Sequence, residues 1–387
     1  MINQNQLSAE FKRQFGIKPE IYLRSPGRVN LIGEHVDYHD GYVMPAAIDL
    51  GIDWAVAKNN LNKVRGISLN TKEKDQFSIE SLTRVKTQWL QYLQGVVAVL
   101  RQDKKNFGGI DIIIHGNLPI GSGLSSSSSL VIGSVFALAN LYGLNLSQMA
   151  MTDIGCRAEW WYGTRGGNMD HFAISHGQKN KAMFFDIRNL TFEYLPITEN
   201  LAIVIFETTI RHNQKSSPFA QRRQEAEKAL KILQKTFPGQ KINKLRDVNH
   251  NMLKNARSKL DDLSFRRALH VVSENRRVLS TRQAFKKHNL TLVGKNLASS
   301  HQSLRDNYQV SCRQLDIAVA EANKIKGLIA SRMTGGGFGG CTVNLVVKDQ
   351  AEDFAQQLSI KFQQKTGLSP KVYICQAAAG VKLTGQF

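Results

Sequence analysis

The residues best suited to chemistry lie between Leu118 and Leu130, in the stretch LPIGSGLSSSSSL. Two glycines and five consecutive serines follow a short, isoleucine-rich apolar run. Glycine lets a backbone approach a ligand closely and adopt a positive φ angle, and serine hydroxyls can donate to phosphate or coordinate Mg²⁺. The pattern favours a phosphate-binding loop over a serine-rich linker or a plain helix cap. It is not a Walker motif, because no Gly-Lys-Ser/Thr follows the glycines.

The elements on either side would position this loop. The apolar run 109–114 predicts a strand, and the helical spacing of apolar residues from Leu130 to Leu141 predicts a helix that ends near Gly143. The first turn of a helix has unpaired N–H groups and the positive end of the helix dipole, so anions bind there. Strand, glycine turn and helix in this order therefore predict a phosphate site.

Three other segments concentrate polar residues or glycines. Residues 24–47 place Glu34, His35 and Asp37 within four positions, which suits hydrogen bonds to the vicinal hydroxyls of a sugar, although a polar turn with a helix cap has the same pattern. Asp170 follows a glycine-rich turn. Five glycines surround Phe338, which indicates tight turns or a backbone close to another segment or a ligand.

Glu159 is a candidate metal ligand near the end of a helix predicted over 147–161. A buried carboxylate there would need a cation, so Mg²⁺ is one candidate partner, and an exposed helical Glu is the alternative. The sequence also predicts helices over 87–101 and 218–237, a strand over 201–206, and mainly helices from 245 to 326.

Composition limits the class of protein. The chain has 387 residues, 42% of them apolar, which is enough for two or three domains with a sizeable core. It has no apolar run of about 18 residues and no apolar signal segment at its start, so we expect neither a membrane span nor export. Four scattered cysteines argue against a zinc site or a disulfide scaffold and fit a reducing cytosol. The net charge of +20 is dispersed, which favours a solvated basic surface that attracts anionic ligands over a nucleic-acid-binding protein.

Taken together, three motifs resemble those of the GHMP kinases, and within that family those of the galactokinase branch. They are PGRVNLIGEHVDYHDG at 26–41, LPIGSGLSSSSSL, and RMTGGGFGGCTV from 332, and the likeness extends to 267–270, 274–275, 300–306 and 310–312. The resemblance implies an α+β fold of two domains with the active site between them. Residues 1–195 would form a ribosomal-S5-like domain with a mostly antiparallel sheet, and residues 196–387 a ferredoxin-like domain.

The resemblance also implies a reaction and a set of residues. ATP with Mg²⁺ would phosphorylate the C1 hydroxyl of α-D-galactose, Asp170 would accept the hydroxyl proton, and Arg28 would keep Asp170 ionised. Ser127 and Glu159 would bind Mg²⁺. The triphosphate would be held, mostly by backbone N–H groups, by Gly121, Ser122, Gly123, Leu124, Ser125, Ser126 and Ser127. The sugar would contact Glu34, His35, Val36, Asp37, Gly167 and Phe219.

Several departures from the family pattern cluster around the sugar and metal sites. Phe219 stands where the family has a tyrosine whose hydroxyl touches the sugar, and Arg165 is new in its loop and could pair with a substrate carboxylate. The segment between Glu159 and Asp170 is one residue shorter than usual. Two alternatives therefore stay open: a kinase for a uronic acid or an N-acetylhexosamine, and a regulator that binds sugar and ATP without turnover. In each case we expect a cytoplasmic monomer that acts on small molecules, with no nucleic-acid or membrane partner.

Overall fold

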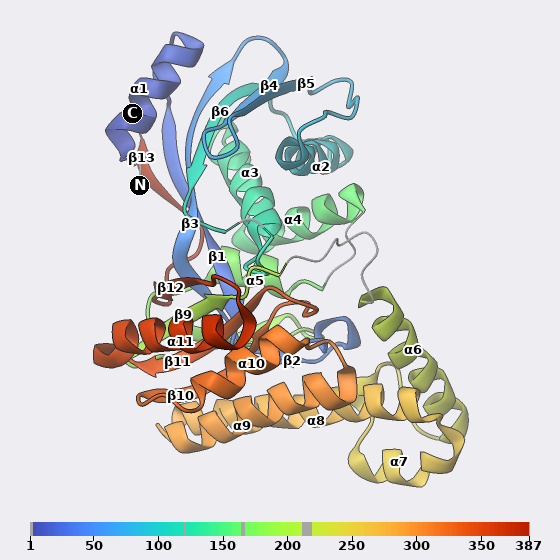
Figure 1. The fold of residues 1–387 in the computed structure, drawn as a ribbon. Coiled ribbons are helices and arrows are strands. Elements are labelled where there is room, and N and C mark those ends of the chain that lie inside the picture. Colours follow the sequence, from blue (N-terminus) through green and yellow to red (C-terminus); the bar gives the residue numbers. More distant parts are fainter. Residues whose placement is uncertain (1–2, 120, 164–166, 211–218, 387) are drawn as a thin grey trace.

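Three β-sheets and the helices packed on them form the fold (Figure 1). The computed structural model describes residues 3–119, 121–163, 167–210 and 219–386. Among the described strands, all pairings within the sheets are antiparallel except one. Mixed helices and mostly antiparallel strands confirm the predicted α+β class. Within these ranges no helix is both long and apolar enough to cross a membrane.

The first sheet contains the strand that leads into the phosphate loop. Its strands, in spatial order, are β13 (Lys382–Gln386), β1 (Ile21–Asn30), β3 (Pro45–Asn59), β6 (Gly109–Gly116), β4 (Lys63–Ser68) and β5 (Glu73–Ser78). The isoleucines of β6 alternate between two apolar cores, as the period of two in a strand requires. Ile112 and Ile114 pack in the main core, whereas Ile113 packs with Phe11 of α1 (Gln4–Phe15). The apolar run of β6 is therefore buried on both faces.

Four helices pack against the first sheet or against one another. They are α2 (Gln88–Gln102), α3 (Ser126–Tyr142), α4 (Gln148–Tyr162) and α5 (Met169–His176). Helix α4 begins after the predicted Ser147 cap, whose side chain accepts from the N–H of Ala150. Helix α3 begins at Ser126, four residues before the start predicted from its apolar pattern. The pattern marks only where a helix becomes buried, so it missed the polar first turn formed by the serines.

The second sheet shares its core with the first. Its strands, in spatial order, are β10 (Leu328–Thr334), β11 (Cys341–Val347), β9 (Leu201–Glu207) and β12 (Lys371–Cys375). Val204 and Phe206 point to a core formed with α10 (Arg313–Ala322) and α11 (Ala351–Thr366). Ile203 and Ile205, on the opposite face of β9, join the main core. One apolar core therefore continues from the first sheet to the second and fixes their relative positions.

A helical lobe supports the segment between β1 and β2. A small sheet consists of β2 (Tyr42–Val43), β7 (Lys181–Asp186) and β8 (Thr191–Pro196). The lobe itself consists of α6 (Phe219–Thr236), α7 (His250–Asn255), α8 (Asp262–Lys286) and α9 (Leu290–Ser303). Short 3₁₀ turns cover Asp37–His39, Leu245–Asp247, Arg257–Lys259 and Lys348–Gln350, and a π turn covers Leu304–Tyr308. Helices α8 and α9 run side by side along the bottom of Figure 1, and α8 contacts both β2 and β8.

The predicted domain division at residue 195 lies close to a change of sheet. Strand β8 ends at Pro196 in the small sheet, and β9 begins the second sheet at Leu201. The last strand, β13, returns to pair with β1 in the first sheet. The division into units of 1–195 and 196–387 therefore stays a prediction. Strand β13 belongs to the second unit by sequence but pairs with the first sheet.

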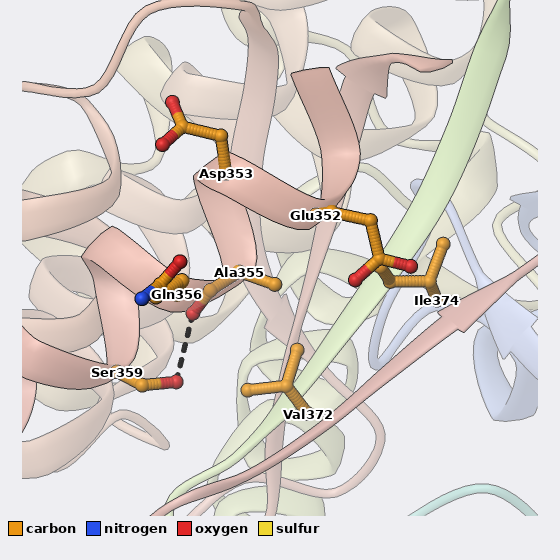
Figure 2. Close-up of a pocket in the computed structure, with 7 residues that line it drawn as sticks. All are labelled: Glu352, Asp353, Ala355, Gln356, Ser359, Val372 and Ile374. Atoms are coloured by element: carbon orange, nitrogen blue, oxygen red, sulfur yellow. Dashed lines mark hydrogen bonds between the residues drawn. The ribbon is translucent and has the colours of Figure 1, made fainter. Parts of the chain in front are cut away.

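A shallow hollow of about 440 Å³ lies between α11 and β12 (Figure 2). Its lining consists of Glu352, Asp353, Ala355, Gln356, Ser359, Val372 and Ile374. Local structure accounts for its polar groups. Ser359 donates to the carbonyl of Ala355 at 2.8 Å, and the two acidic residues lie in the first turn of α11, where the helix dipole stabilises negative charge. The residues predicted to bind substrate lie elsewhere.

Candidate active site

The loop between β6 and α3 has a backbone suited to an anion. Leu118 and Leu124 are buried, while Gly121 and Gly123 are exposed. Both glycines, with φ of 76° and 80°, and Ser125, with φ of 60°, occupy the left-handed region. No side-chain hydrogen bond caps α3 at Ser125, so the first-turn N–H groups remain for a ligand.

The five serines face different directions because successive helical residues are rotated by about 100°. Ser125 donates to Oδ2 of Asp170. Ser128 donates to Oε2 of Glu159 at 3.2 Å, and Ser129 donates to a carbonyl of β1 at 3.0 Å. The two serines between Ser125 and Ser128 are half-buried. Ser127 also forms a hydrogen bond with Tyr92 of α2, so a bound phosphate or metal would share its hydroxyl with that tyrosine.

Asp170, the predicted base, forms a bidentate ion pair with Arg28. Nε and Nη2 of Arg28 donate to the two carboxylate oxygens at 2.7 and 2.8 Å, and its Nη1 donates to the carbonyl of Gly123 at 2.6 Å. Burial raises the pKa of Asp170, but the charge of Arg28 and hydrogen bonds from Arg28 and Ser125 outweigh it and lower the pKa below its usual value. The carboxylate is therefore ionised at neutral pH, directly beside the phosphate loop.

Glu34 connects the first motif to the third, glycine-rich motif. Its Oε1 accepts from the N–H of Gly335 at 2.9 Å and from Oγ1 of Thr334 at 3.1 Å. Nη2 of the fully buried Arg332 lies 3.3 Å from the same oxygen, and Nη1 of Arg332 donates to the carbonyl of Leu31 at 2.8 Å. Because Oε1 is fully used in these contacts, Oε2 is the oxygen available to a ligand.

Asp37 packs directly against the backbone of Gly167. A Cβ at position 167 would lie only 1.9 Å from Oδ2 of Asp37, so a larger residue does not fit there. Burial raises the pKa of Asp37 to about 6, and the charges of Asp170 and Glu34 add to the effect. The three predicted carboxylates therefore lie close enough to repel one another. Such a group is suited to a ligand that donates several hydrogen bonds, such as a sugar.

His35 and Phe219 form an aromatic wall beside these carboxylates. The His35 ring lies 5.4 Å from the Phe219 ring and 4.8 Å from that of Tyr308, measured between centroids. Nδ1 of His35 lies 2.9 Å from the hydroxyl of Tyr38. Nε2 is buried and has no hydrogen-bond partner within the described part of the chain. A ligand in this site would contact the apolar ring of Phe219, at the position where the family pattern has a tyrosine hydroxyl.

Helix α8 holds the backbone of the sugar motif from behind. Nε2 of His270 lies 3.1 Å from the carbonyl of Glu34, and the carboxylate of Glu274 accepts from the N–H of Gly33 at 3.0 Å. Asn275 accepts from the N–H of Tyr42, the first residue of β2, at 2.9 Å. These contacts explain why the family likeness includes 267–270 and 274–275, which lie far from the motif in sequence.

Val36 does not present its side chain to the site. It is fully buried in an apolar core with Val43, Met169 and Phe172. Any contact of Val36 with the sugar would therefore involve its backbone, and that contact stays a prediction. Arg165, one of the noted departures, lies outside the described residues.

Ser127 and Glu159, the predicted Mg²⁺ ligands, lie on neighbouring helices. Glu159 is buried, which excludes the exposed alternative, and Nε2 of His171 lies 2.8 Å from its Oε2. Burial lowers the pKa of His171, but Cys156 and Glu159 reverse this and raise it well above its usual value. A protein cation therefore already faces one oxygen of Glu159.

The two ligands fit a metal carried by a nucleotide better than a metal bound by the protein alone. Mg²⁺ prefers oxygen ligands and usually keeps waters and substrate phosphates, with one or two groups from the protein. A serine hydroxyl and the second oxygen of Glu159 match that donor set. Among the described residues no group of three His, Cys, Asp or Glu side chains could hold a metal ion.

Three buried residues of the site were not predicted. Tyr38 and Tyr308 contact each other and His35, and Arg332 supports Glu34. Tyr38 and Arg332 lie inside recognised motifs, but a motif does not show which of its residues are buried. Tyr308 gave no usable signal, because its contact with Tyr38 spans 270 positions.

Known proteins match this chain along nearly its whole length. Residues 9–58 match the galactokinase galactose-binding signature, 91–178 the N-terminal domain of GHMP kinases and 281–364 their C-terminal domain. Galactokinase from Roseiflexus sp. (strain RS-1) is 36% identical over 382 residues, which cover 98% of this chain and 97% of the relative. Galactokinase from Clostridium acetobutylicum is 37% identical over 98% of each chain.

Solved structures give the same result for the fold. The crystal structure of Lactococcus lactis galactokinase complexed with galactose superimposes with a TM-score of 0.93 at 32% identity, covering 98% of this chain and 99% of the other. A mevalonate kinase, at 17% identity and a TM-score of 0.66, shares the fold alone.

Proposed function

Because the chain belongs to the galactokinase family of GHMP kinases, we propose that it transfers the γ-phosphoryl group of ATP to the C1 hydroxyl of α-D-galactose. One observation carries the proposal. Asp170 accepts hydrogen bonds both from Arg28 of β1 and from Ser125 of the phosphate loop, so the predicted base lies where sugar and nucleotide would meet. Full-length identity of 36–37% to galactokinases supports the choice of sugar.

The ionised Asp170 suits direct, in-line transfer. Its carboxylate would accept the C1 hydroxyl proton while the sugar oxygen bonds to the γ-phosphorus and the bond to ADP breaks. A carboxylate with a lowered pKa is a weak base, so the proton would move late, as the hydroxyl becomes acidic through bonding to phosphorus. Arg28 would hold Asp170 in position and stabilise negative charge on the transferred group.

The phosphate loop would hold the triphosphate through the backbone between Gly121 and Ser127. When bound, Mg²⁺ would neutralise charge on the phosphates, with Ser127 and Glu159 as its protein ligands. Ser128 and His171 contact the other oxygen of Glu159 and would orient its carboxylate.

The protein would recognise the sugar mainly through carboxylates that accept hydrogen bonds from the sugar hydroxyls. Glu34 offers Oε2 and Asp37 offers a carboxylate with a pKa of about 6, and Gly167 would contribute its backbone. Hydrogen bonds from sugar hydroxyls to these carboxylates would reduce the repulsion among Glu34, Asp37 and Asp170. The same repulsion disfavours a uronic acid, whose own carboxylate would add a further negative charge.

A second sugar class is favoured by one observation. Phe219 presents an apolar ring where the family pattern has a tyrosine hydroxyl, and this ring would pack against the methyl group of a substituent such as an acetamido group. An N-acetylhexosamine is therefore the alternative substrate. We also propose that the enzyme acts as a cytoplasmic monomer on small molecules only, which light scattering of the purified chain would test.

An ADP-release assay with saturating ATP and Mg²⁺ tests the proposal. The panel contains galactose, glucose, galacturonate and N-acetylgalactosamine, and Asp170→Asn is the inactive control. We expect turnover of galactose above the other sugars. Turnover of N-acetylgalactosamine alone would support the alternative. Binding of sugar and ATP by calorimetry without ADP release would mean that the chain is a ligand-binding regulator.

A further inference from the structure

A chain of hydrogen bonds connects Tyr308 and Tyr38 to His35 of the sugar motif. The hydroxyl of Tyr308 lies 2.8 Å from that of Tyr38, which lies 2.9 Å from Nδ1 of His35. Exposed fractions are 0% for Tyr308, 8% for Tyr38 and 5% for His35, so little water can reach these groups. The chain of hydrogen bonds ends at Nε2 of His35, which is buried and lacks a partner among the residues described.

His35 is held as a neutral ring. Burial lowers its pKa to about 3, and His270 and Arg332 act in the same direction and outweigh the opposing effects of the Gly336 backbone and Glu274. A neutral imidazole carries one proton, on either Nδ1 or Nε2. Which nitrogen carries it decides whether His35 offers the ligand a donor or an acceptor, and the partner of the other nitrogen sets that choice.

The surroundings of Tyr308 decide the direction of the hydrogen bonds. If Nδ1 of His35 donated to Tyr38, Tyr38 would donate to Tyr308, and the Tyr308 proton would need a further acceptor. Within the described ranges Tyr38 is the one hydrogen-bond partner of the Tyr308 hydroxyl. A buried hydroxyl proton without an acceptor is costly, so this direction is disfavoured. In the opposite direction Tyr308 donates to Tyr38 and Tyr38 donates to Nδ1, so both tyrosine protons have acceptors. The proton left over is then the Nε2–H of His35, which a bound ligand would accept.

We propose that Tyr308 and Tyr38 are positioning residues that fix His35 as the Nε2–H tautomer, so that His35 donates a hydrogen bond to one sugar hydroxyl. The inference rests on the proposed function and deepens it. His35 is then the donor among acceptors, since Glu34 and Asp37 offer carboxylate oxygens. A hydroxyl can accept from His35 and donate to a carboxylate at the same time, whereas an ether or ammonium group cannot do both.

Aromatic packing keeps the ring in place for this role. The Tyr308 ring packs against the rings of both His35 and His270, with centroid distances of 4.8 Å to each. The Phe219 ring lies 5.4 Å from His35 and 5.8 Å from that of Tyr38. The rings thus fix the plane of His35, and the hydroxyls fix its proton.

The tautomer can be measured without turnover. In the full-length protein labelled with ¹⁵N-histidine, ring nitrogen shifts distinguish a protonated nitrogen from an unprotonated one. The chain has 10 histidines, so His35→Gln assigns the relevant signals. We expect a protonated Nε2 and an unprotonated Nδ1 between pH 6 and 8, and a mixture of tautomers in Tyr38→Phe. A protonated Nδ1 in the unmodified protein would overturn the proposal.

Deoxy sugars provide a second, independent readout. Tyr38→Phe should raise the KM for galactose about 5- to 10-fold with kcat changed less than twofold, as expected for one lost hydrogen bond. Tyr308→Phe should act in the same direction but less. The matched control is Tyr142→Phe, which removes a hydroxyl that donates to Gly109 at 2.7 Å, remote from the site, and should leave both constants unchanged.

Combining the Tyr38→Phe variant with deoxy sugars then identifies the sugar hydroxyl that contacts His35. With 2-, 3-, 4- and 6-deoxygalactose, the Tyr38→Phe effect on KM should vanish for the one sugar that lacks the hydroxyl facing His35. An equal effect on all four sugars would mean a general loss of packing and would refute the positioning role. If no sugar is phosphorylated, the proposed function fails, whereas the ¹⁵N spectra still decide the tautomer.

Discussion

The phosphate loop and the sugar motif are built in different ways. The phosphate loop uses backbone N–H groups, and its shape is set by glycines and a helix start within about ten positions of one another. The sugar motif uses side chains, and its supports are remote: Glu34 is held from 301 positions away by Gly335, and Tyr38 from 270 positions away by Tyr308. Substitutions at these distant supports should therefore weaken sugar binding more than ATP binding.

Asp170 joins the two regions, so its loss should have the largest effect. Asp170→Asn removes the proton acceptor and should lower kcat by about 10³-fold, within the usual range for a general base. Binding of ATP, measured by calorimetry, should change little, because the loop backbone is retained. A variant that keeps more than a tenth of the turnover would refute the role of Asp170 as base.

Gly167→Ala should damage the sugar region alone. The new Cβ would lie 1.9 Å from Oδ2 of Asp37 and would displace that carboxylate. We expect kcat/KM for galactose to fall about 100-fold, as for other displacements of about 1 Å in active sites. The KM for ATP, measured at saturating galactose, should stay within twofold. A comparable rise in both KM values would mean that the two regions are not separable.

Asp37→Asn should make the folded protein more stable but weaken the binding of galactose. The pKa of Asp37 is about 6 in the folded protein and near 3.8 in the unfolded chain, so ionisation opposes folding. The penalty is absent below pH 3.8, grows as the pH rises, and is complete above pH 6. At pH 8 the variant should therefore be more stable by about 2 kcal/mol, after allowance for partial exposure.

Urea unfolding of both proteins at pH 5 and pH 8 measures this difference. The gain should be smaller at pH 5, and the galactose KM of the variant should rise at least about tenfold through the loss of a charged acceptor. A variant less stable than the parent at pH 8 would contradict the assigned pKa.

Gly121→Ala is the counterpart of Gly167→Ala in the phosphate loop. A Cβ at Gly121 meets no atom within 4 Å, but φ is 76°, so the cost is backbone strain of about 1–2 kcal/mol. We expect the KM for ATP to rise about tenfold and that for galactose to stay unchanged. If galactose binding suffers equally, the loop does not act as a local unit.

Phe219→Tyr should have the smallest effect and the opposite sign. Restoring the hydroxyl that relatives carry should lower the galactose KM about threefold to fivefold, as one solvent-accessible hydrogen bond would. Turnover of N-acetylgalactosamine should fall relative to galactose if the apolar ring accommodates the acetamido group. No change for either sugar would mean that position 219 does not contact the substrate.

Apolar spacing and helix caps predicted the helices and strands that position the site, but some of their details were missed. The strand before the phosphate loop and the helices over 87–101, 147–161 and 218–237 lie where apolar spacing and caps placed them. The start of α3 was placed too late, because Ser126 to Ser129 have no apolar periodicity although they form its first turn. The motif does not show that the side chain of Val36 is buried in an apolar core, so its predicted contact with the sugar would have to involve the backbone.

The sequence by itself determined the phosphate loop, the order of the motifs and the family, because backbone turns and helix starts depend on neighbouring residues. Only the tertiary structure decided which serine faces Asp170, which faces Glu159 and which packs against β1. It also decided that Glu159 is buried against His171 and that Tyr308 contacts the sugar motif. These pairings join residues 12 to 270 positions apart, and packing of the shared core, rather than local conformation, brings the most distant of them within contact distance.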